Sequence, residues 1–567
     1  MSAARDNGVR SRFSRFPDNV TETRKSRSDP HGVKELALVL LAGAALSVAL
    51  TYPTAFELGR VGRVDKGDGQ LSIWNVAWVA RTLVVDPRHV FDANIFYPHR
   101  GTLAYSENNL GAGALAIPMY WATRNPYAAH NFVMLLAFVL SAAGMYYLVR
   151  YLTGDRRAAA ISAIGFAFCP FVFAHTAHIQ LLMTAGLPFT MLAFHRMADR
   201  PDIQRGVVLG LAMAAQAICC GYYGVFVCLM VGFAILVLAS TRKQWLARPF
   251  WVAILTAALV AIVLVLPAFL PYVSVQEVGF HRELKDAIQY SANWSDYLAS
   301  SSYAHAWMLG YLPPWSEVSF PGFVIAALGV AGAVIATRDR RIELLLLYGG
   351  LALLAFWASF GPKALLYSAL YHAVPMFAWL RAPARFGLVV GFGLSVLAGV
   401  AASHWLQRVR QPTVLAAALV LVSAGELFVP LYLPAVPPVE PVYRTLATLP
   451  RGPVIEMPFF YPQVGLFQHT KYMLASTAHW MPMVNGYSDY IPPDFYEHVM
   501  TLAPFPSRAA FKILEPNRVR YAVFHMYGYN TENRNDVLTR LKEFEPYLRP
   551  LYQDESTRLY EIVGFPP

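Results

Sequence analysis

The sequence predicts a mainly α-helical membrane protein, in which a polytopic bundle of transmembrane helices precedes a soluble α/β domain. Of the 567 residues, 56% are hydrophobic and 14% are charged, and the mean hydropathy is +0.39. An ordinary soluble domain has about 25% charged residues. Apolar runs of membrane-spanning length recur between residues 35 and 431. After residue 433 these runs stop, and short runs of β-forming residues alternate with polar segments.

Eleven segments have the length and composition expected of transmembrane helices. A helix needs about 20 mainly apolar residues to cross the hydrocarbon core of a bilayer. The segment 110–121 is too short for this, and we expect a half-inserted helix there. The eleven predicted spans are 35–52, 128–150, 158–174, 181–196, 206–220, 222–240, 249–271, 321–337, 342–360, 386–405 and 413–431.

Basic residues predict which side of the membrane each loop faces, because short cytoplasmic loops carry an excess of Lys and Arg. Residues 1–34 form a basic tail without a signal-peptide cleavage site, which predicts a disordered cytoplasmic tail followed by an uncleaved signal anchor. With this tail inside, the basic loops all face the cytoplasm. These loops contain Arg150, Arg156 and Arg157; Arg196, Arg200 and Arg205; Arg242, Lys243 and Arg248; Arg338, Arg340 and Arg341; and Arg408 and Arg410.

The same topology gathers the polar loops on the outer face of a cytoplasmic (inner) membrane. The net charge of +11 is then explained by topology, and we expect no nucleic-acid partner. The predicted spans carry little charge, whereas a proton-coupled transporter needs ionisable groups within the membrane. The predicted outer segments are 53–108, 175–180, 272–320, 361–385 and 434–567, the last of which includes the C-terminus.

The four cysteines all fall within predicted spans, so they indicate neither a disulfide framework nor a zinc site. They are Cys169, Cys219, Cys220 and Cys228.

Residues 434–567 are expected to form the separate extracytoplasmic α/β domain, after the membrane domain at 35–433. Prolines cluster at the boundary, and three β-type runs follow at 454–457, 519–525 and 559–563. A helix is predicted near 535–544. The aromatic stretch 485–492 could face a sugar or a peptide, but ordinary loop packing is the favoured interpretation of its tyrosines.

The first outer loop contains the stretch that we interpret as holding the reactive carboxylate. Asp68 is the first choice and Asp65 the second, because glycines on both sides of Asp68 allow the backbone to approach a ligand closely. An aspartate just before a helix is also a common N-cap, and the two roles are compatible. Trp74 and Trp78, one turn apart in the helix expected from about 69 to 84, are typical of a segment at the membrane–water boundary.

Other polar residues of the outer loops are candidate ligand contacts. His175, His178 and Gln180 lie in a turn between two apolar segments. Two histidines three residues apart suit a metal, a phosphate or a hydrogen bond to a catalytic carboxylate, although a lone histidine is usually structural. Glu107 and Asn108 close the first loop and suit an acceptor or a metal. A divalent cation is therefore left open as a cofactor.

Arg381 and Arg385 lie at the outer end of a predicted span. Pro383 breaks the helix between them and can direct Arg381 inward. The alternative for Arg385 is that it marks a helix end beside lipid headgroups. The run 281–286 is interpreted as a solvated helix face.

The order of these features resembles the GT-C superfamily of membrane glycosyltransferases, and most closely a bacterial group of GT-C-like membrane proteins. Many GT-C enzymes have paired acidic residues in the first outer loop, whereas Asp65 and Asp68 are separated here by two residues. The resemblance extends over nearly the whole chain. The residues that carry it are Gly67-Asp68, Trp74-Asn75, Trp78, Phe96-Tyr97-Pro98, Leu103-Ala104-Tyr105-Ser106-Glu107, Tyr127 with Asn131, His178-Ile179-Gln180, and Arg381-Ala382-Pro383-Ala384-Arg385-Phe386.

This resemblance implies transfer of a sugar from a polyprenyl-phosphate donor to a glycan or protein acceptor at the outer membrane face. It implies a carboxylate, Asp68 or Asp65, as general base, and arginines at the leaving phosphate. Membrane lipid is the further expected partner. The alternatives are a flippase or export protein that uses the same outer pocket without bond chemistry, and a membrane anchor for a binding domain. The expected substrate-binding residues are Arg381, Arg385, His175, His178, Gln180, Glu107, Asn75 and Trp74.

Overall fold

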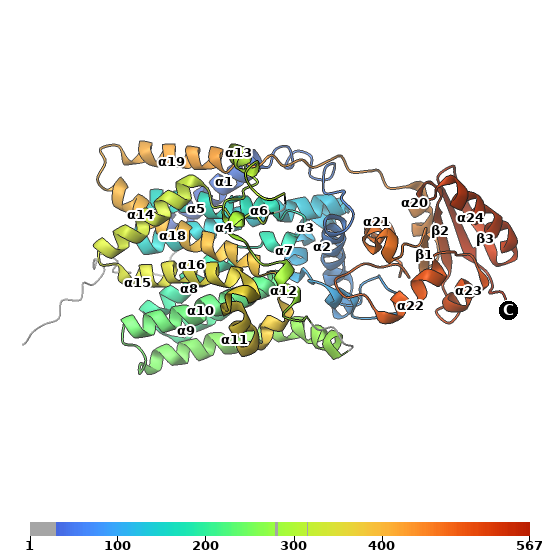
Figure 1. The fold of residues 1–567 in the computed structure, drawn as a ribbon, viewed down its shortest axis with the longest axis horizontal. Helices are drawn as coiled ribbons and strands as arrows, with labels where there is room; N and C mark the ends of the chain where they lie inside the picture. The colour runs from blue at the N-terminus through green and yellow to red at the C-terminus, as the bar shows by residue number, and fades with distance from the viewer. Residues whose placement is uncertain (1–29, 278–281, 315) are drawn as a thin grey trace, which may run out of the picture.

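The computed structural model describes residues 30–277, 282–314 and 316–567, which form a helical bundle with a small α/β unit at one end (Figure 1). This architecture confirms the predicted fold class. Helix α1 (Pro30–Leu50) begins before the predicted start at residue 35. The rest of the predicted tail, residues 1–29, lies outside the described residues.

Each of the eleven predicted spans is mainly helical, and the protein is a multi-pass membrane protein. By length and composition, seven helices of the described residues can cross a membrane, and α9, α14 and α19 are shorter apolar helices. The remaining bundle elements are α4 (Pro126–Thr153), α5 (Arg156–Ala167), α6 (Pro170–Ala174), α7 (Ile179–Leu182), α8 (Gly186–Asp199), α9 (Ile203–Cys219), α10 (Gly221–Thr241), α11 (Arg248–Glu277), α14 (Phe323–Arg338), α15 (Ile342–Leu344), α16 (Gly350–Ser359), α18 (Gly387–Leu406) and α19 (Pro412–Glu426). Short helices α12 (Asp286–Gln289), α13 (Ala306–Leu309) and α17 (Leu366–Ala373) lie in the connecting segments.

Helix α4 shows how local sequence sets the ends of these helices. The Asn125 side chain accepts hydrogen bonds from the backbone N–H groups of Tyr127 and Ala128, and Pro126 occupies the first turn. At the other end Gly154 adopts a left-handed conformation with φ 74°. The next helix starts almost at once, so α4 and α5 are antiparallel neighbours.

Helix α2 (Asp68–Val85) lies across the end of the bundle, between the bundle and the C-terminal unit (Figure 1). Helix α3 (Leu110–Thr123) packs against α2 and α4. Trp74 and Trp78 of α2 are 1% and 7% exposed, so they do not face lipid as their spacing suggested. The C-terminal unit covers them, and Trp480 lies 5.6 Å from Trp78 between ring centroids.

Ion pairs join helix ends at the end of the bundle away from the C-terminal unit, where α15 lies (Figure 1). Arg242 of the α10–α11 turn contacts Glu343 of α15 at 2.6 Å and Asp199 of α8 at 2.7 Å. The α4–α5 turn is tied to α1 in the same way, because Arg156 contacts Glu35 at 2.6 Å. The α4–α5 and α10–α11 turns, two of the predicted basic loops, are thus fixed to neighbouring helices by ion pairs.

The C-terminal unit contains a four-stranded mixed sheet in the order β1-β2-β4-β3. Its strands are β1 (Val454–Met457), β2 (Tyr521–His525), β3 (Leu548–Gln553) and β4 (Thr557–Ile562); β1 and β2 are parallel and the other pairs antiparallel. Three of these strands coincide with predicted runs, whereas β3, an edge strand interrupted by Pro550, was not predicted. The helices are α20 (Pro441–Thr448), α21 (Thr470–Ala475), α22 (Pro493–Leu502), α23 (Arg508–Leu514) and α24 (Thr531–Glu543).

Backbone hydrogen bonds join the C-terminal unit to the first outer loop. The Tyr97 N–H donates to the Met483 carbonyl at 2.8 Å, and the Tyr490 N–H donates to the Tyr105 carbonyl at 2.8 Å. The Asn94 side chain adds a bond to the Met481 carbonyl at 3.0 Å. The first loop and the C-terminal unit therefore form one continuous platform over the end of the bundle.

Candidate active site

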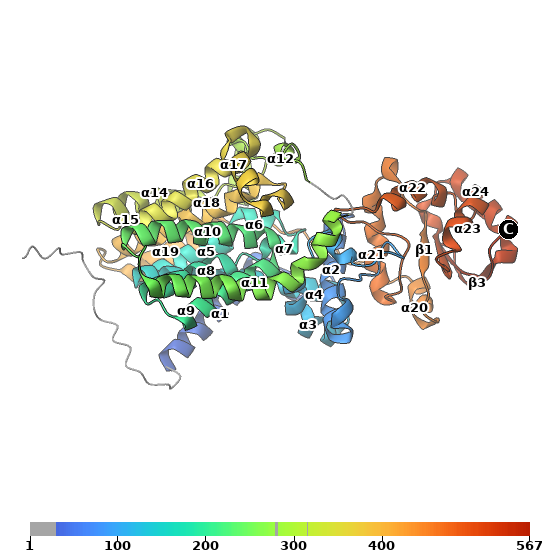
Figure 2. The same cartoon turned by 90° about the horizontal axis from the view of Figure 1, so that it is seen from below.

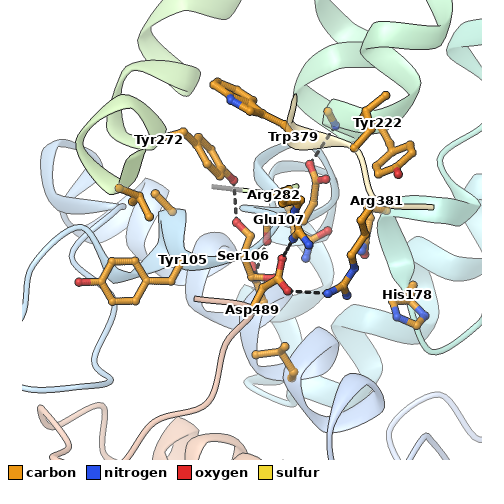
Figure 3. A pocket seen from close by; sticks show the side chains of 18 of the residues that line it. Tyr105, Ser106, Glu107, His178, Tyr222, Tyr272, Arg282, Trp379, Arg381 and Asp489 are labelled. Atoms are coloured by element: carbon orange, nitrogen blue, oxygen red, sulfur yellow. Dashed lines mark hydrogen bonds and ion pairs between the residues drawn. The ribbon is translucent and has the colours of Figure 1, made fainter. Parts of the chain in front are cut away.

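A cavity of about 210 Å³ lies under this platform (Figure 3). Its walls come from segments far apart in the sequence: α2, the end of the first loop, the turn before α7, the start of α10, the end of α11, the segment 376–385 and the loop 487–489 of the C-terminal unit. Of the predicted site residues, Asp68, Asn75, Glu107, His178, Gln180, Arg381 and Arg385 line it.

Asp68 is placed in the cavity by a glycine that begins helix α2. Gly67 has φ 94°, a left-handed conformation that favours glycine, and its N–H donates to the Thr470 hydroxyl at 2.9 Å. Gly67 is the N-cap and no side chain caps the helix, so the proposed capping role of Asp68 is wrong. Asp68 is the first helical residue, where a negative charge is favoured by the helix dipole.

The Asp68 carboxylate contacts His178 Nε2 at 3.3 Å. The hydrogen bond from His178 lowers the pKa of Asp68, and the positive charges of Arg381 and Arg385 act in the same direction against partial burial. Asp68 is therefore ionised at neutral pH, as a proton acceptor must be.

Asp65, the second choice, does not line the cavity. Its side chain is 49% exposed and contacts Arg63 at 3.5 Å. Sequence proximity alone did not separate the two acids, but the turn at Gly67 directs only Asp68 inward.

The predicted residues of the histidine turn, 175–180, also differ in whether they reach the cavity. His178 and Gln180 line the cavity, whereas His175 does not. The His175 ring packs against the Phe171 ring in a tilted arrangement with centroids 4.3 Å apart, and its Nδ1 lies 2.7 Å from the Phe171 carbonyl. Burial lowers the pKa of His175 to about 3, so this ring is a neutral packing group.

The two predicted arginines differ in their partners. Arg381 Nη1 contacts Asp489 Oδ1 at 2.8 Å, and its guanidinium lies 5.2 Å from the Tyr290 ring. The Arg385 guanidinium stacks on Tyr222 at 4.5 Å, and it forms no ion pair among the residues that the structure describes. Arg385 is thus a cation in the cavity wall.

Glu107 and Asn75 form a polar corner of the cavity. Glu107 accepts a hydrogen bond from the Gly221 N–H at 2.9 Å, and burial raises the pKa of its carboxyl. Asn75 Nδ2 donates to the Glu107 carbonyl at 3.0 Å. Its Oδ1 is buried and has no hydrogen-bond partner among the described residues, so it can accept a bond from a ligand.

Trp74, the remaining predicted contact, lies outside the cavity wall. Its indole N–H donates to Asn94 Oδ1 at 3.2 Å, and Asn94 in turn bonds the C-terminal unit. Trp74 therefore supports the platform rather than a ligand.

Several cavity residues were missed by sequence reasoning. Arg282 belongs to the run interpreted as a solvated helix face, yet its side chain is 14% exposed and it contacts Asp489; His281 of that run lies outside the described residues. Tyr487 and Asp489 come from the stretch interpreted as loop packing. An acid among tyrosines after an Asn-Gly turn was the available signal. Aromatic walls complete the cavity: Tyr222, Phe269, Tyr272 and Trp379.

Asp68 and His178 are two potential metal ligands in contact. Among the described residues no group of three or more His, Cys, Asp or Glu side chains is arranged to hold a metal ion. The protein side chains alone therefore do not complete a typical metal site.

A family model described as dolichyl-phosphate-mannose-protein mannosyltransferase matches residues 123–270. No curated protein matches the chain by sequence. Among solved structures, the arabinofuranosyltransferase AftD from mycobacteria aligns with a TM-score of 0.55 and 16% identity, over 94% of this chain and 40% of that one. This chain therefore spans well under half of AftD.

Two further structures align over most of the chain. The Archaeoglobus fulgidus oligosaccharyltransferase gives a TM-score of 0.44 and 14% identity, over 92% of this chain and 72% of that one. ArnT from Cupriavidus metallidurans bound to undecaprenyl phosphate gives 0.41 and 14%, over 94% and 98%. The alignment with AftD shows that the chain has the fold of that protein, in agreement with the resemblance drawn from its sequence.

Proposed function

We propose that the protein is a glycosyltransferase that moves a sugar from a polyprenyl-phosphate donor to an acceptor at the outer face of the cytoplasmic membrane. The observation that carries this proposal is the convergence of an ionised acid, Asp68, and two arginines, Arg381 and Arg385, in one cavity. The matched family model adds support, because its description names a lipid-phosphate sugar, dolichyl-phosphate-mannose, and the matched segment includes α4, α10 and most of α11.

In the proposed reaction Asp68 is the general base. It takes the proton of the acceptor hydroxyl or amide while the acceptor atom bonds to the anomeric carbon. The bond between that carbon and the phosphate oxygen breaks, and the lipid phosphate leaves with the electron pair. The contact with His178 orients the Asp68 carboxylate and keeps it deprotonated.

Arg385 is the preferred partner of the leaving phosphate. A guanidinium suits phosphate because it donates two parallel hydrogen bonds. Arg385 is fixed by its stacking on Tyr222, so little side-chain entropy is lost when an anion binds. A preorganised cation at the leaving oxygen stabilises the charge that develops in the transition state.

The remaining walls suit a sugar. The free Oδ1 of Asn75 can accept a hydrogen bond from a sugar hydroxyl. Gln180 also lines the cavity. Tyr222, Tyr272 and Trp379 offer apolar ring faces to the C–H groups of a pyranose or furanose.

Helix α11 connects this cavity to the lipid. Figure 2 shows α11 running along the surface of the bundle to the end where α2 lies. Leu259, Ile262 and Leu266 are more than half exposed on α11, whereas Phe269 and Tyr272 line the cavity. A polyprenyl chain in the membrane can thus lie against α11 while its phosphate reaches Arg385.

Purified protein in proteoliposomes, supplied with a panel of decaprenyl-phosphate sugars and envelope glycans or peptides, tests the proposal. We expect mass spectrometry to detect a new glycosidic bond and free decaprenyl phosphate in equal amounts. Donor that is relocated across the membrane but chemically unchanged would instead support the export alternative. Failure of every donor to react in folded protein would refute the proposed activity.

A further inference from the structure

Asp489 of the C-terminal unit forms ion pairs with two arginines inside the cavity (Figure 3). Arg381 contacts one carboxylate oxygen at 2.8 Å, and Arg282 contacts the other. Both guanidinium groups therefore converge on a single small anion. The three side chains are 24%, 37% and 14% exposed for Asp489, Arg381 and Arg282, so the contact is shielded from bulk water on most sides.

The loop that carries Asp489 is held on both sides by the platform. The Phe96 N–H donates to the Asn485 carbonyl at 3.2 Å, and the Tyr490 N–H donates to the Tyr105 carbonyl at 2.8 Å. Gly486 lies against Phe96 so closely that a Cβ atom there would be 2.7 Å from the ring. The backbone around Asp489 is thus firmly placed, and the freedom that remains is in its side chain.

The arginines belong to different segments of the bundle. Arg282 follows α11, and Arg381 precedes the short helical turn Pro383–Phe386. Two guanidinium groups in a partly buried site repel each other unless an anion lies between them. Asp489 supplies that anion. Two oxygens of a phosphate diester present the same fork of acceptors with the same single negative charge.

We propose that Arg282 and Arg381 form an anion site for the phosphate of the lipid-linked donor, and that Asp489 fills this site until the donor displaces it. This inference rests on the proposed function and extends it, because it gives the C-terminal unit a part in donor binding. The exchange replaces one anion by another, so the net charge beside the arginines is unchanged. Arg385 then assists the incoming phosphate from the neighbouring wall.

Binding of decaprenyl monophosphate to the full-length protein in lipid nanodiscs tests this exchange, with decaprenol as the neutral probe. Asp489→Asn removes the competing charge while keeping the side-chain volume. We expect it to bind decaprenyl phosphate about tenfold more tightly, within the 5–150-fold range of typical coupling between two bound groups. Arg381→Gln alone should weaken the binding of decaprenyl phosphate. The double variant Asp489→Asn/Arg381→Gln should lose most of the affinity gained by Asp489→Asn.

Asp494→Asn is the matched control, because Asp494 lies on the same unit, contacts His99 at 2.9 Å and does not line the cavity. Its affinity should equal that of the wild type. Weaker or unchanged binding in folded Asp489→Asn would overturn the inference and indicate that Asp489 only positions the arginines. If wild-type protein does not bind decaprenyl phosphate, the proposed donor is wrong as well, so the two failures are distinguishable.

A second measurement uses wild-type protein and does not depend on a variant folding. Carbodiimide with an amine labels accessible carboxyl groups, and mass spectrometry locates the label. Decaprenyl phosphate should increase labelling at Asp489 and leave Asp494 unchanged, whereas decaprenol should change neither. Unchanged or reduced labelling of Asp489 at saturating decaprenyl phosphate would refute displacement.

Discussion

Replacing Asp68 by Asn tests the proposed base most directly. The carboxamide has nearly the same shape as the carboxylate and can still contact His178, but it cannot accept the acceptor's proton. General base catalysis contributes roughly a hundredfold to ten-thousandfold in rate. At about 1.4 kcal/mol per factor of ten, this loss corresponds to about 3–5 kcal/mol of transition-state stabilisation. Donor binding should change little, because the arginines remain.

The chain offers a matched control three residues away. Asp65→Asn removes the same charge from the same loop, but the Asp65 side chain is half exposed and lies outside the cavity wall. It should keep kcat within about twofold of the wild type, since surface changes away from a site usually have small effects.

The assay is the initial rate of product formation in proteoliposomes at saturating donor, so that kcat is measured apart from KM. Thermal unfolding of each variant confirms that it is folded. The reasoning fails if folded Asp68→Asn retains more than about a tenth of wild-type kcat. It also fails if Asp65→Asn loses as much activity as Asp68→Asn.

Four further outcomes follow from the contacts described. His178→Ala removes the hydrogen bond that lowers the pKa of Asp68, so the acid limb of kcat/KM should move to higher pH than in the wild type; an unmoved limb would contradict this coupling. Arg385→Gln should lower kcat/KM for the donor about 10–150-fold, the equivalent of 1.5–3 kcal/mol for a hydrogen bond to a charged group, and an unchanged value would exclude a phosphate contact. Glu107→Ala leaves the Gly221 N–H without its acceptor and should destabilise the protein by about 1–3 kcal/mol in chemical unfolding, whereas Glu107→Gln keeps an acceptor and should be milder. His525→Ala removes the partner that lies 2.8 Å from the fully buried Glu456 and leaves that carboxyl, among the described residues, only the 3.4 Å hydrogen bond from the Tyr443 hydroxyl; a loss of about 3–5 kcal/mol in urea unfolding is expected, and near wild-type stability would show that Glu456 does not need His525.

The bundle was predictable because its signal is local. Each apolar run of sufficient length became helical, whereas the orientation that the Lys and Arg bias indicates stays a prediction. The strand β1 was located exactly at Val454–Met457, because a short run of β-forming residues lies between prolines and turns. Edge strand β3 was not predicted because Pro550 interrupts its short run, and a proline within a run argues against a strand.

The site was predictable only in part, because its contacts join distant segments. Asp489 meets Arg381 and Arg282 across sequence separations of 108 and 207 residues, which no local pattern reveals. Trp74 and His175 lie outside the cavity wall for a different reason. Both are in polar-rich stretches near the cavity, but tertiary packing turns their rings toward Asn94 and Phe171. Residue type and spacing identified the right loops, and the fold decided which side chains enter the cavity.

The hydrogen bond from Gly67 to Thr470 has a practical consequence for deletion studies. Thr470 belongs to the C-terminal unit, and its hydroxyl also bonds the Gln70 side chain in the first turn of α2. A protein truncated at residue 433 would lose this support at the residue preceding Asp68 and would expose Trp78 to water. Inactivity of such a truncation is therefore expected whatever the C-terminal unit recognises. Point variants of Tyr487 and Asp489, the two residues of the loop that line the cavity, report on recognition without dismantling the helix that presents the acid.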